Sequence, residues 1–131
     1  MAVVTVSGST TPVAKGVIRT AWTFATSLAP TSGSIGNPLS APNYPDKTVI
    51  WRGPWVSGVT IVIQGSNTAT YSTGIAKWFT LNDPQGNALS KATGAVEAIL
   101  ENPRWLRPRI SARTGVLGAP VIEILSQSTR R

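Results

Sequence analysis

The sequence lacks the two residue types that most often perform acid–base and metal chemistry in proteins, since its 131 residues include no histidine and no cysteine. Without cysteine, neither a disulfide framework nor a cysteine metal site can form. Without histidine, a Ser-His-Asp triad and the commonest metal ligand are excluded. Acidic residues are few and scattered, with no spaced carboxylate pair: Asp46, Asp83, Glu97, Glu101 and Glu123. We therefore expect a protein that is not an enzyme and that uses no metal or other cofactor.

Basic residues outnumber acidic ones, twelve to five, which gives a formal net charge of +7. Such an excess favours acidic partners: nucleic acid, an anionic membrane surface or an acidic protein lattice. Total charged content is only 13%, whereas a dedicated nucleic-acid binder concentrates many basic residues on one element. No apolar run approaches the ~20 residues of a membrane span, and Met1 to Ser9 lacks the features of a signal peptide. We therefore expect a protein partner, with neither a membrane nor nucleic acid as the main one.

Glycine and proline interrupt the chain at short intervals and β-branched residues fill the gaps, a pattern typical of short strands joined by turns. The clearest strand is Val56–Gln64, in which Val59, Ile61 and Ile63 share one face. Ala92–Leu100 has a weak helical spacing, but it is short and contains a glycine, so we predict a strand there. The pattern predicts about seven to nine strands and no convincing helix, as in a two-sheet sandwich.

The predicted fold is therefore all-β: a single-domain antiparallel β-sandwich or jelly roll with an extended N-terminal arm. We expect the arm at residues 1–12, the sandwich domain at 13–125 and a basic C-terminal tail at 126–131. The turn-rich stretch at 30–46 is too long for an ordinary turn, which predicts a functional loop or a covering segment. Pro108 lies within the strand predicted over Trp105–Ser111, which indicates an edge position or a bulge.

Five tryptophans in so short a chain are informative. Three lie within strand patterns and are expected in the core: Trp22, Trp78 and Trp105. Trp51 and Trp55 instead flank Arg52 at the end of a strand, and an exposed tryptophan pair beside an arginine is typical of an interface anchor. Core packing is the alternative for this pair.

The densest basic run comprises Arg104, Arg107, Arg109 and Arg113. In a strand, Arg107 and Arg109 point to the same face as Trp105. Such side chains can pair with carboxylates of a partner protein or bind single-stranded nucleic acid. A solvated sheet face is the remaining interpretation.

Three stretches resemble small structural proteins encoded in the virion gene clusters of tailed bacteriophages: Gly58–Asn67, Trp78–Asn87 and Glu101–Pro108. Those proteins carry a run of the form VTVQGSNDG…W…LTDPQGNAL…ENPRYVRP. The resemblance covers Trp51–Arg113 and implies a head decoration (cement) protein or a tail component, often trimeric. The order of elements is also similar to discoidin-type jelly rolls, which bind glycans or lipid head groups through loops at one end. Because Asn67–Tyr71 replaces the usual DGTNW of that family, no ligand-binding residue carries over.

The resulting hypothesis is a virion structural protein made in the host cytoplasm, specifically a capsid decoration subunit at the capsid surface, with the tail as the alternative location. Its expected partners are the major capsid protein or other virion proteins, and copies of itself in a trimer. Val3 and Val4 in the arm would add a strand to a neighbouring sheet. The alternative function is a glycan-binding module on a tail or fibre, with Trp51, Trp55 and Tyr71 as stacking faces.

Overall fold

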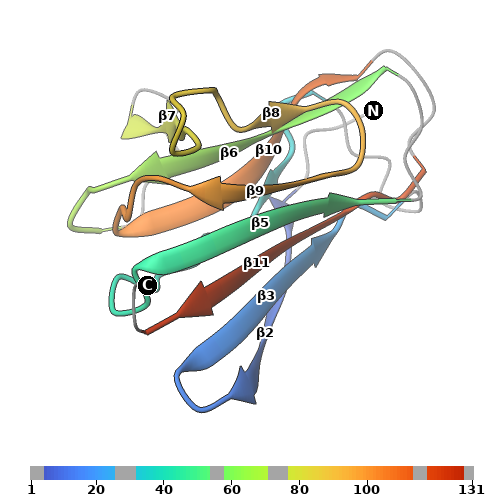
Figure 1. The fold of residues 1–131 in the computed structure, drawn as a ribbon. Helices are drawn as coiled ribbons and strands as arrows, with labels where there is room; N and C mark the ends of the chain where they lie inside the picture. The colour runs from blue at the N-terminus through green and yellow to red at the C-terminus, as the bar shows by residue number, and fades with distance from the viewer. Residues whose placement is uncertain (1–4, 26–31, 54–57, 71–76, 114–117, 129–131) are drawn as a thin grey trace.

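The protein is a two-sheet β-sandwich (Figure 1), as the alternation of apolar residues predicts. The computed structural model describes residues 5–25, 32–53, 58–70, 77–113 and 118–128. Within these ranges, eleven strands are present and no α-helix. No helix in the same ranges has the length and apolar character needed to cross a membrane.

Each sheet is built from strands that are distant in the sequence. Sheet A contains β1 (Thr5–Val6), β4 (Ile35–Gly36), β10 (Trp105–Arg113), β6 (Val59–Ser66) and β7 (Phe79–Thr80) in that order, and β8 (Ser90–Lys91) also pairs with β6. Sheet B contains β2 (Gly8–Ala14), β3 (Val17–Thr23), β11 (Val121–Gln127), β5 (Asp46–Arg52) and β9 (Ala95–Ile99) in that order. The pairings are antiparallel apart from the short β1–β4 ladder, which is parallel. The strand predicted over Ala92–Leu100 is confirmed as β9.

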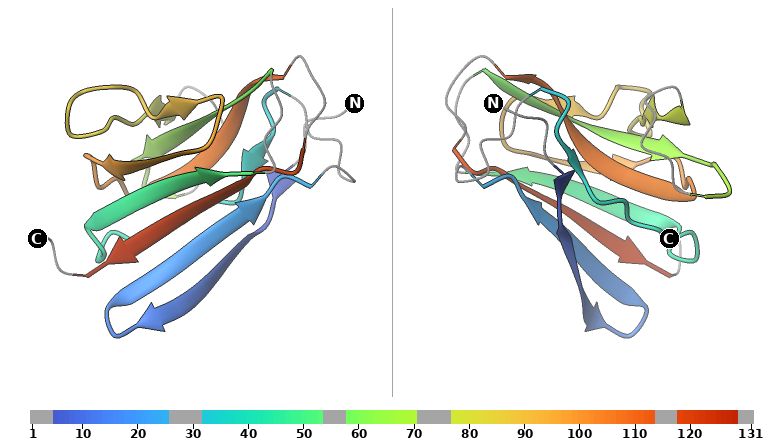
Figure 2. Two further views of the ribbon diagram at one scale, coloured as in Figure 1. Left: turned by 45° about the vertical axis from the view of Figure 1, so that its right-hand side comes forward. Right: turned by 180° about the vertical axis from the view of Figure 1, so that it is seen from behind.

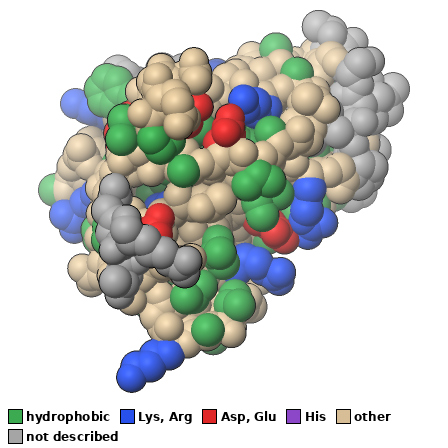
Figure 3. All heavy atoms as spheres, viewed as in Figure 1, with side chains coloured by type: hydrophobic (Ala, Val, Ile, Leu, Met, Phe, Trp, Pro, Cys, Tyr) green, Lys and Arg blue, Asp and Glu red, His purple; other side chains and the backbone are tan. Residues whose placement is uncertain are grey.

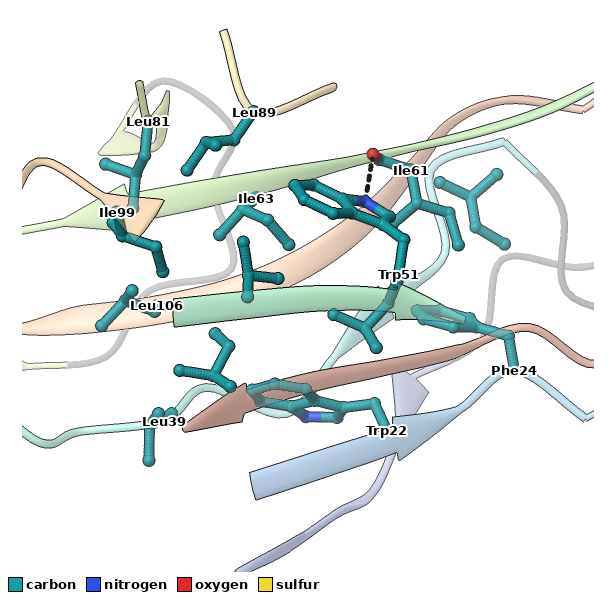
Figure 4. Packing of buried hydrophobic residues seen from close by; sticks show 14 of the residues in the cluster. Trp22, Phe24, Leu39, Trp51, Ile61, Ile63, Leu81, Leu89, Ile99 and Leu106 are labelled. Carbon is teal, nitrogen blue, oxygen red and sulfur yellow. Dashed lines mark hydrogen bonds between the residues drawn. The ribbon is translucent and has the colours of Figure 1, made fainter. Parts of the chain in front are cut away.

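The core lies between the sheets and is filled by the inward-pointing residues of each strand (Figure 4). Ile61 and Ile63 of β6 are fully buried, and they share the inward face with Val59 as predicted. Trp22 from β3 is fully buried in the same cluster, and Trp51 of β5 is only 1% exposed. Burial of each large apolar side chain contributes about 1.5–3 kcal/mol, so this cluster is what holds the two sheets together.

The segment predicted as an N-terminal arm is extended over its described residues, but it pairs with this chain's own strands. β1 lies beside β4, and β2 forms a hairpin with β3 through a turn at Gly16, whose φ is 72°. The hairpin extends away from sheet A (Figure 2). Residue 12, the last residue of the predicted arm, lies within β2, and Val6 is 3% exposed. Residue 125, the last residue of the predicted sandwich domain, lies within β11, and Ser126 of the predicted tail is fully buried.

The hydrogen bonds on the β4 side of β10 decide two predictions, one for Pro108 and one for the turn-rich stretch at 30–46. Pro108 lies inside β10, between β4 and β6, so it is not at a sheet edge. The amides of Leu106 and Ile110 donate to the carbonyls of Leu39 and Ser34 on the β4 side. The nitrogen of Pro108 lies on that same side but has no hydrogen to donate, so the ladder is interrupted there. Residues 33–39 of the stretch thus pair along β10 and extend sheet A rather than forming a free loop, and Asp46 begins β5.

Candidate functional site

The outer face of sheet B consists of the side chains that alternate with its core residues. The strand register places them in three rows across the sheet. One row is Ala21, Glu123, Ile50 and Val96; the next is Arg19, Leu125, Thr48 and Ala98; the third is Thr23, Val121 and Arg52. We call these residues the sheet B face. Most of them are apolar or uncharged, so this face is a continuous surface with little cost of desolvation.

The charged groups of the sheet B face neutralise one another at its centre. Oε1 of Glu123 lies 2.8 Å from Nη2 of Arg52 and 3.8 Å from Nη1 of Arg19. The carboxylate is nearly buried, whereas the two arginine side chains are about half exposed. Hydrophobic side chains gather over the strands of sheet B, with a few charged groups among them (Figure 3). The face therefore combines apolar contact area with an excess of one positive charge.

The predicted interface anchor around Arg52 is only partly present. Arg52 is exposed on the sheet B face, as predicted. The interface role for Trp51 is wrong: its ring is 1% exposed, and its Nε1 donates to the carbonyl of Ile61 across the sandwich at 3.1 Å (Figure 4). Alternation along β5 puts Trp51 on the inward face with Val49, so it packs in the core. Trp55 lies outside the described residues, as do Val3, Val4 and Tyr71.

Arg107 is buried and cannot contact a partner, although it lies on the same face of β10 as Arg109, as predicted. It is 2% exposed, its Nε donates to Oε1 of Gln64 at 3.0 Å, and its guanidinium lies 4.0 Å from the centre of the Trp78 ring. The segment that carries Trp78 covers this part of β10. Arg107 therefore stabilises the sandwich and does not form part of a surface site.

Burial of Arg107 interrupts the predicted basic stripe. Arg104 is exposed, and Arg109 and Arg113 are half-buried. Trp105 is half-buried as well, and its Nε1 donates to the carbonyl of Thr68 at 2.9 Å. The core prediction is confirmed for Trp22, which belongs to the cluster between the sheets. Trp78 is buried as well, but against Arg107 on the outer face of β10, and neither Trp78 nor Trp105 belongs to that cluster. The remaining arginines do not form a continuous basic and aromatic track.

A pocket of about 370 Å³ lies where β6 ends, β7 begins and the chain passes from β9 to β10. The buried part of its lining, which we call the floor, is mainly apolar, from Gly65, Leu81 and Pro103 with Ser66 beside them; the exposed and half-buried part, the rim, includes Asn67, Phe79, Asn82 and Glu101. We call it the end pocket. All three stretches that resemble phage structural proteins contribute to it. Sequence reasoning named none of these residues as site residues, because only the strand pairing brings them together.

Carboxylates in the described ranges are dispersed or used in turns, and no group of three or more ligating side chains there forms a metal site. Asp83 illustrates this: its Oδ1 accepts hydrogen bonds from the amides of Gln85 and Asn87, both at 2.9 Å. The Asn87 amide is the main reason that the pKa of Asp83 lies below its usual value. Residues 82–87 therefore form a turn, in which Gly86 has a φ of 89°.

Comparison with known proteins shows a similarity of fold to a solved structure. No protein-family model matches the chain, and no curated protein matches it. Among solved structures, the chain is similar to the SPBc2 prophage-derived protein YomS, with a TM-score of 0.55 and 14% sequence identity. The alignment covers 88% of this chain and 98% of that chain. At this identity the likeness is one of fold, and it extends over nearly the whole sandwich.

Proposed function

We propose that this chain is a non-enzymatic structural protein of a bacteriophage virion. In this role it decorates the capsid surface as a trimer, and it binds the lattice of the major capsid protein through the sheet B face. The observation that carries the proposal is that face: a strand-built, largely apolar surface whose central carboxylate is already paired with arginines of the same chain. Such a surface can bury a large area against another protein with its central carboxylate already paired, and one positive charge remains for an acidic partner.

Two further observations support a phage origin and an acidic lattice as partner. The sequence resembles small virion structural proteins over Trp51–Arg113, and the fold is similar to that of a prophage-derived protein. The net charge of +7 favours association with an acidic surface, because opposite fields steer the encounter. Arg19 and Arg52 place part of this charge at the proposed contact.

The direct test of the docking face replaces one exposed apolar residue on it with a charged one. Val96 is 62% exposed on β9, the edge strand of sheet B, where it pairs with Ile50 at the end of the first row. Val96→Asp places a carboxylate on the proposed contact, where it would lose its water without a partner. We expect binding to purified capsids that lack the protein to weaken about tenfold or more, measured by co-sedimentation.

The matched control is Phe79→Asp, because Phe79 is 68% exposed and lies in β7 on the other sheet. It should bind capsids as the unchanged protein does. Circular dichroism should show both variants folded, since substitutions at such exposed positions typically change stability by about 0.5 kcal/mol. Equal binding by the two variants would contradict docking through sheet B. A monomer in solution that never co-purifies with particles would contradict the proposal as a whole.

A further inference from the structure

We propose that the end pocket binds a neutral saccharide, which stacks on the Phe79 ring and donates hydrogen bonds to the Glu101 carboxylate. This inference is separate from the proposed capsid contact, because the pocket opens beside β7 of sheet A and shares no residue with the sheet B face. Its volume, about 370 Å³, lies at the small end of the ~300–1,000 Å³ range of small-molecule pockets. It therefore suits a sugar ring rather than an extended polymer.

The floor of the pocket is preformed and apolar. A Cβ atom added to Gly65 would lie 2.6 Å from Cγ of Pro103 and 2.7 Å from Cδ2 of Leu81. The backbone of β6 therefore approaches these two side chains as closely as packing allows, and only glycine fits at that position. Such a floor offers van der Waals contact to the C–H groups of a sugar ring and offers nothing to a charged group.

Phe79 supplies an aromatic surface at the rim. It is 68% exposed, the largest exposure among the exposed large hydrophobic residues in the described ranges. The fold does not require it there, because β7 is only two residues long and pairs with β6 through the backbone. An exposed ring beside a pocket is a platform on which an apolar face can stack.

Glu101 supplies fixed acceptor oxygens in the lining of the same pocket. Its Oε1 accepts the amide hydrogen of Asn82 at 2.9 Å, and its Oε2 accepts from Nδ2 of the same residue, also at 2.9 Å. An ionised carboxylate has about four acceptor positions, so each oxygen retains capacity for one further donor. The two bonds to Asn82 hold the carboxylate in one orientation, so its free positions are arranged before a ligand arrives.

The connection that carries Glu101 is itself held rigid. The buried ammonium of Lys47 donates to Oδ1 of Asn102 and to the carbonyls of Ala41 and Tyr44. Nδ2 of Asn102 donates in turn to the carbonyl of Pro42 at 2.9 Å. Binding therefore requires little ordering of this rim, which lowers the entropic cost.

These groups select the ligand class. A carboxylate accepts hydrogen bonds and donates none, so it matches hydroxyl groups and repels anionic sugars. The net charge of +7 disfavours a cationic ligand through the long-range field. A neutral sugar combines hydroxyl donors with an apolar C–H face, and it satisfies both the carboxylate and the Phe79 ring.

Titration calorimetry on the full chain tests the inference with methyl glycosides of glucose, galactose, mannose and N-acetylglucosamine. Sialyllactose and choline chloride serve as the anionic and cationic probes. We expect at least one neutral glycoside to bind and neither charged probe to do so. Glu101→Gln should weaken that binding about tenfold, because one charge-assisted hydrogen bond is lost, and Phe79→Ala should weaken it by a similar factor through loss of stacking.

Matched controls separate the pocket from general effects. Glu97→Gln removes a carboxylate that pairs with Lys91 at 3.0 Å outside the pocket, and Val13→Ala trims an exposed apolar residue of β2. Both should leave the affinity within about twofold. Glu101→Gln could alter the rim, because Glu101 also bonds to Asn82. Phe79→Ala avoids this problem, because the Phe79 ring is exposed and its removal leaves the fold intact. The inference is overturned if no neutral glycoside binds, if choline binds more tightly, or if Phe79→Ala binds unchanged. None of these results bears on capsid docking.

Discussion

Trp51→Phe distinguishes a core tryptophan from an interface anchor, which are the two roles the sequence allows for this residue. The indole is 1% exposed, and its Nε1 donates across the sandwich to the carbonyl of Ile61 at 3.1 Å. Phenylalanine removes that hydrogen bond, at a cost of about 0.5–1.5 kcal/mol. The smaller ring also leaves unfilled volume, which costs a further ~1–2 kcal/mol. We expect the free energy of unfolding to fall by about 2–3 kcal/mol.

Urea unfolding followed by circular dichroism measures this directly, with an unchanged m value showing that only stability has changed. For a domain of this size the melting temperature should fall by roughly 6–15 °C. Trp105→Phe is the matched control, because Trp105 is half-buried and loses one hydrogen bond to Thr68; its cost should be about 1 kcal/mol. If Trp51→Phe leaves stability unchanged but abolishes capsid binding, the placement of Trp51 in the core is refuted.

Three further predictions concern groups that the fold uses internally. Arg107→Lys should destabilise by about 2 kcal/mol in urea unfolding, because an ammonium cannot both stack on the Trp78 ring and reproduce the guanidinium bond to Gln64; a cost near zero would contradict the burial of this residue. Gly65→Ala should lower the free energy of unfolding by about 1–3 kcal/mol through overpacking. Gly94→Ala should be nearly neutral, because its added Cβ meets only the Trp51 carbonyl at 3.4 Å. Equal costs would contradict the packing described at Gly65. The pKa of Asp83 is lowered in the folded state, so its contribution to the free energy of unfolding is present above the ordinary pKa and is lost as pH falls through the folded pKa. Asp83→Asn should therefore flatten the acid limb of a plot of stability against pH, and an unchanged limb would refute this role.

The sequence predicts the strands and the core well, because both follow from local alternation. Val59, Ile61 and Ile63 lie on the inward face as the pattern indicates, and β9 is a strand. The same rule contained the information needed to place Trp51, since alternation along β5 puts it on the face of Val49. The glycine and proline that follow Arg52 do mark the end of β5, but the position of a strand end does not decide which face Trp51 lies on.

What alternation cannot show is which segment covers the outward face of a strand. Arg107 lies on the outer face of β10 as predicted, but a segment nearly thirty residues earlier in the chain covers it with Trp78. Lys47 is a different case: alternation puts it on the inward face of β5 with Val49 and Trp51, but does not show that carbonyls and an amide oxygen accept the hydrogens of its buried ammonium. The end pocket and the sheet B face depend on the register of distant strands, and no local pattern specifies that register.

The copy number of this chain in purified phage particles tests the central proposal most directly. Quantitative mass spectrometry, with the major capsid protein as internal reference, measures it without any assumption about the docking face. A decoration subunit predicts hundreds of copies in a fixed ratio to the capsid protein. A dozen copies or fewer would place the protein at the neck, tail or fibre, and absence from the particles would contradict a structural role in the virion.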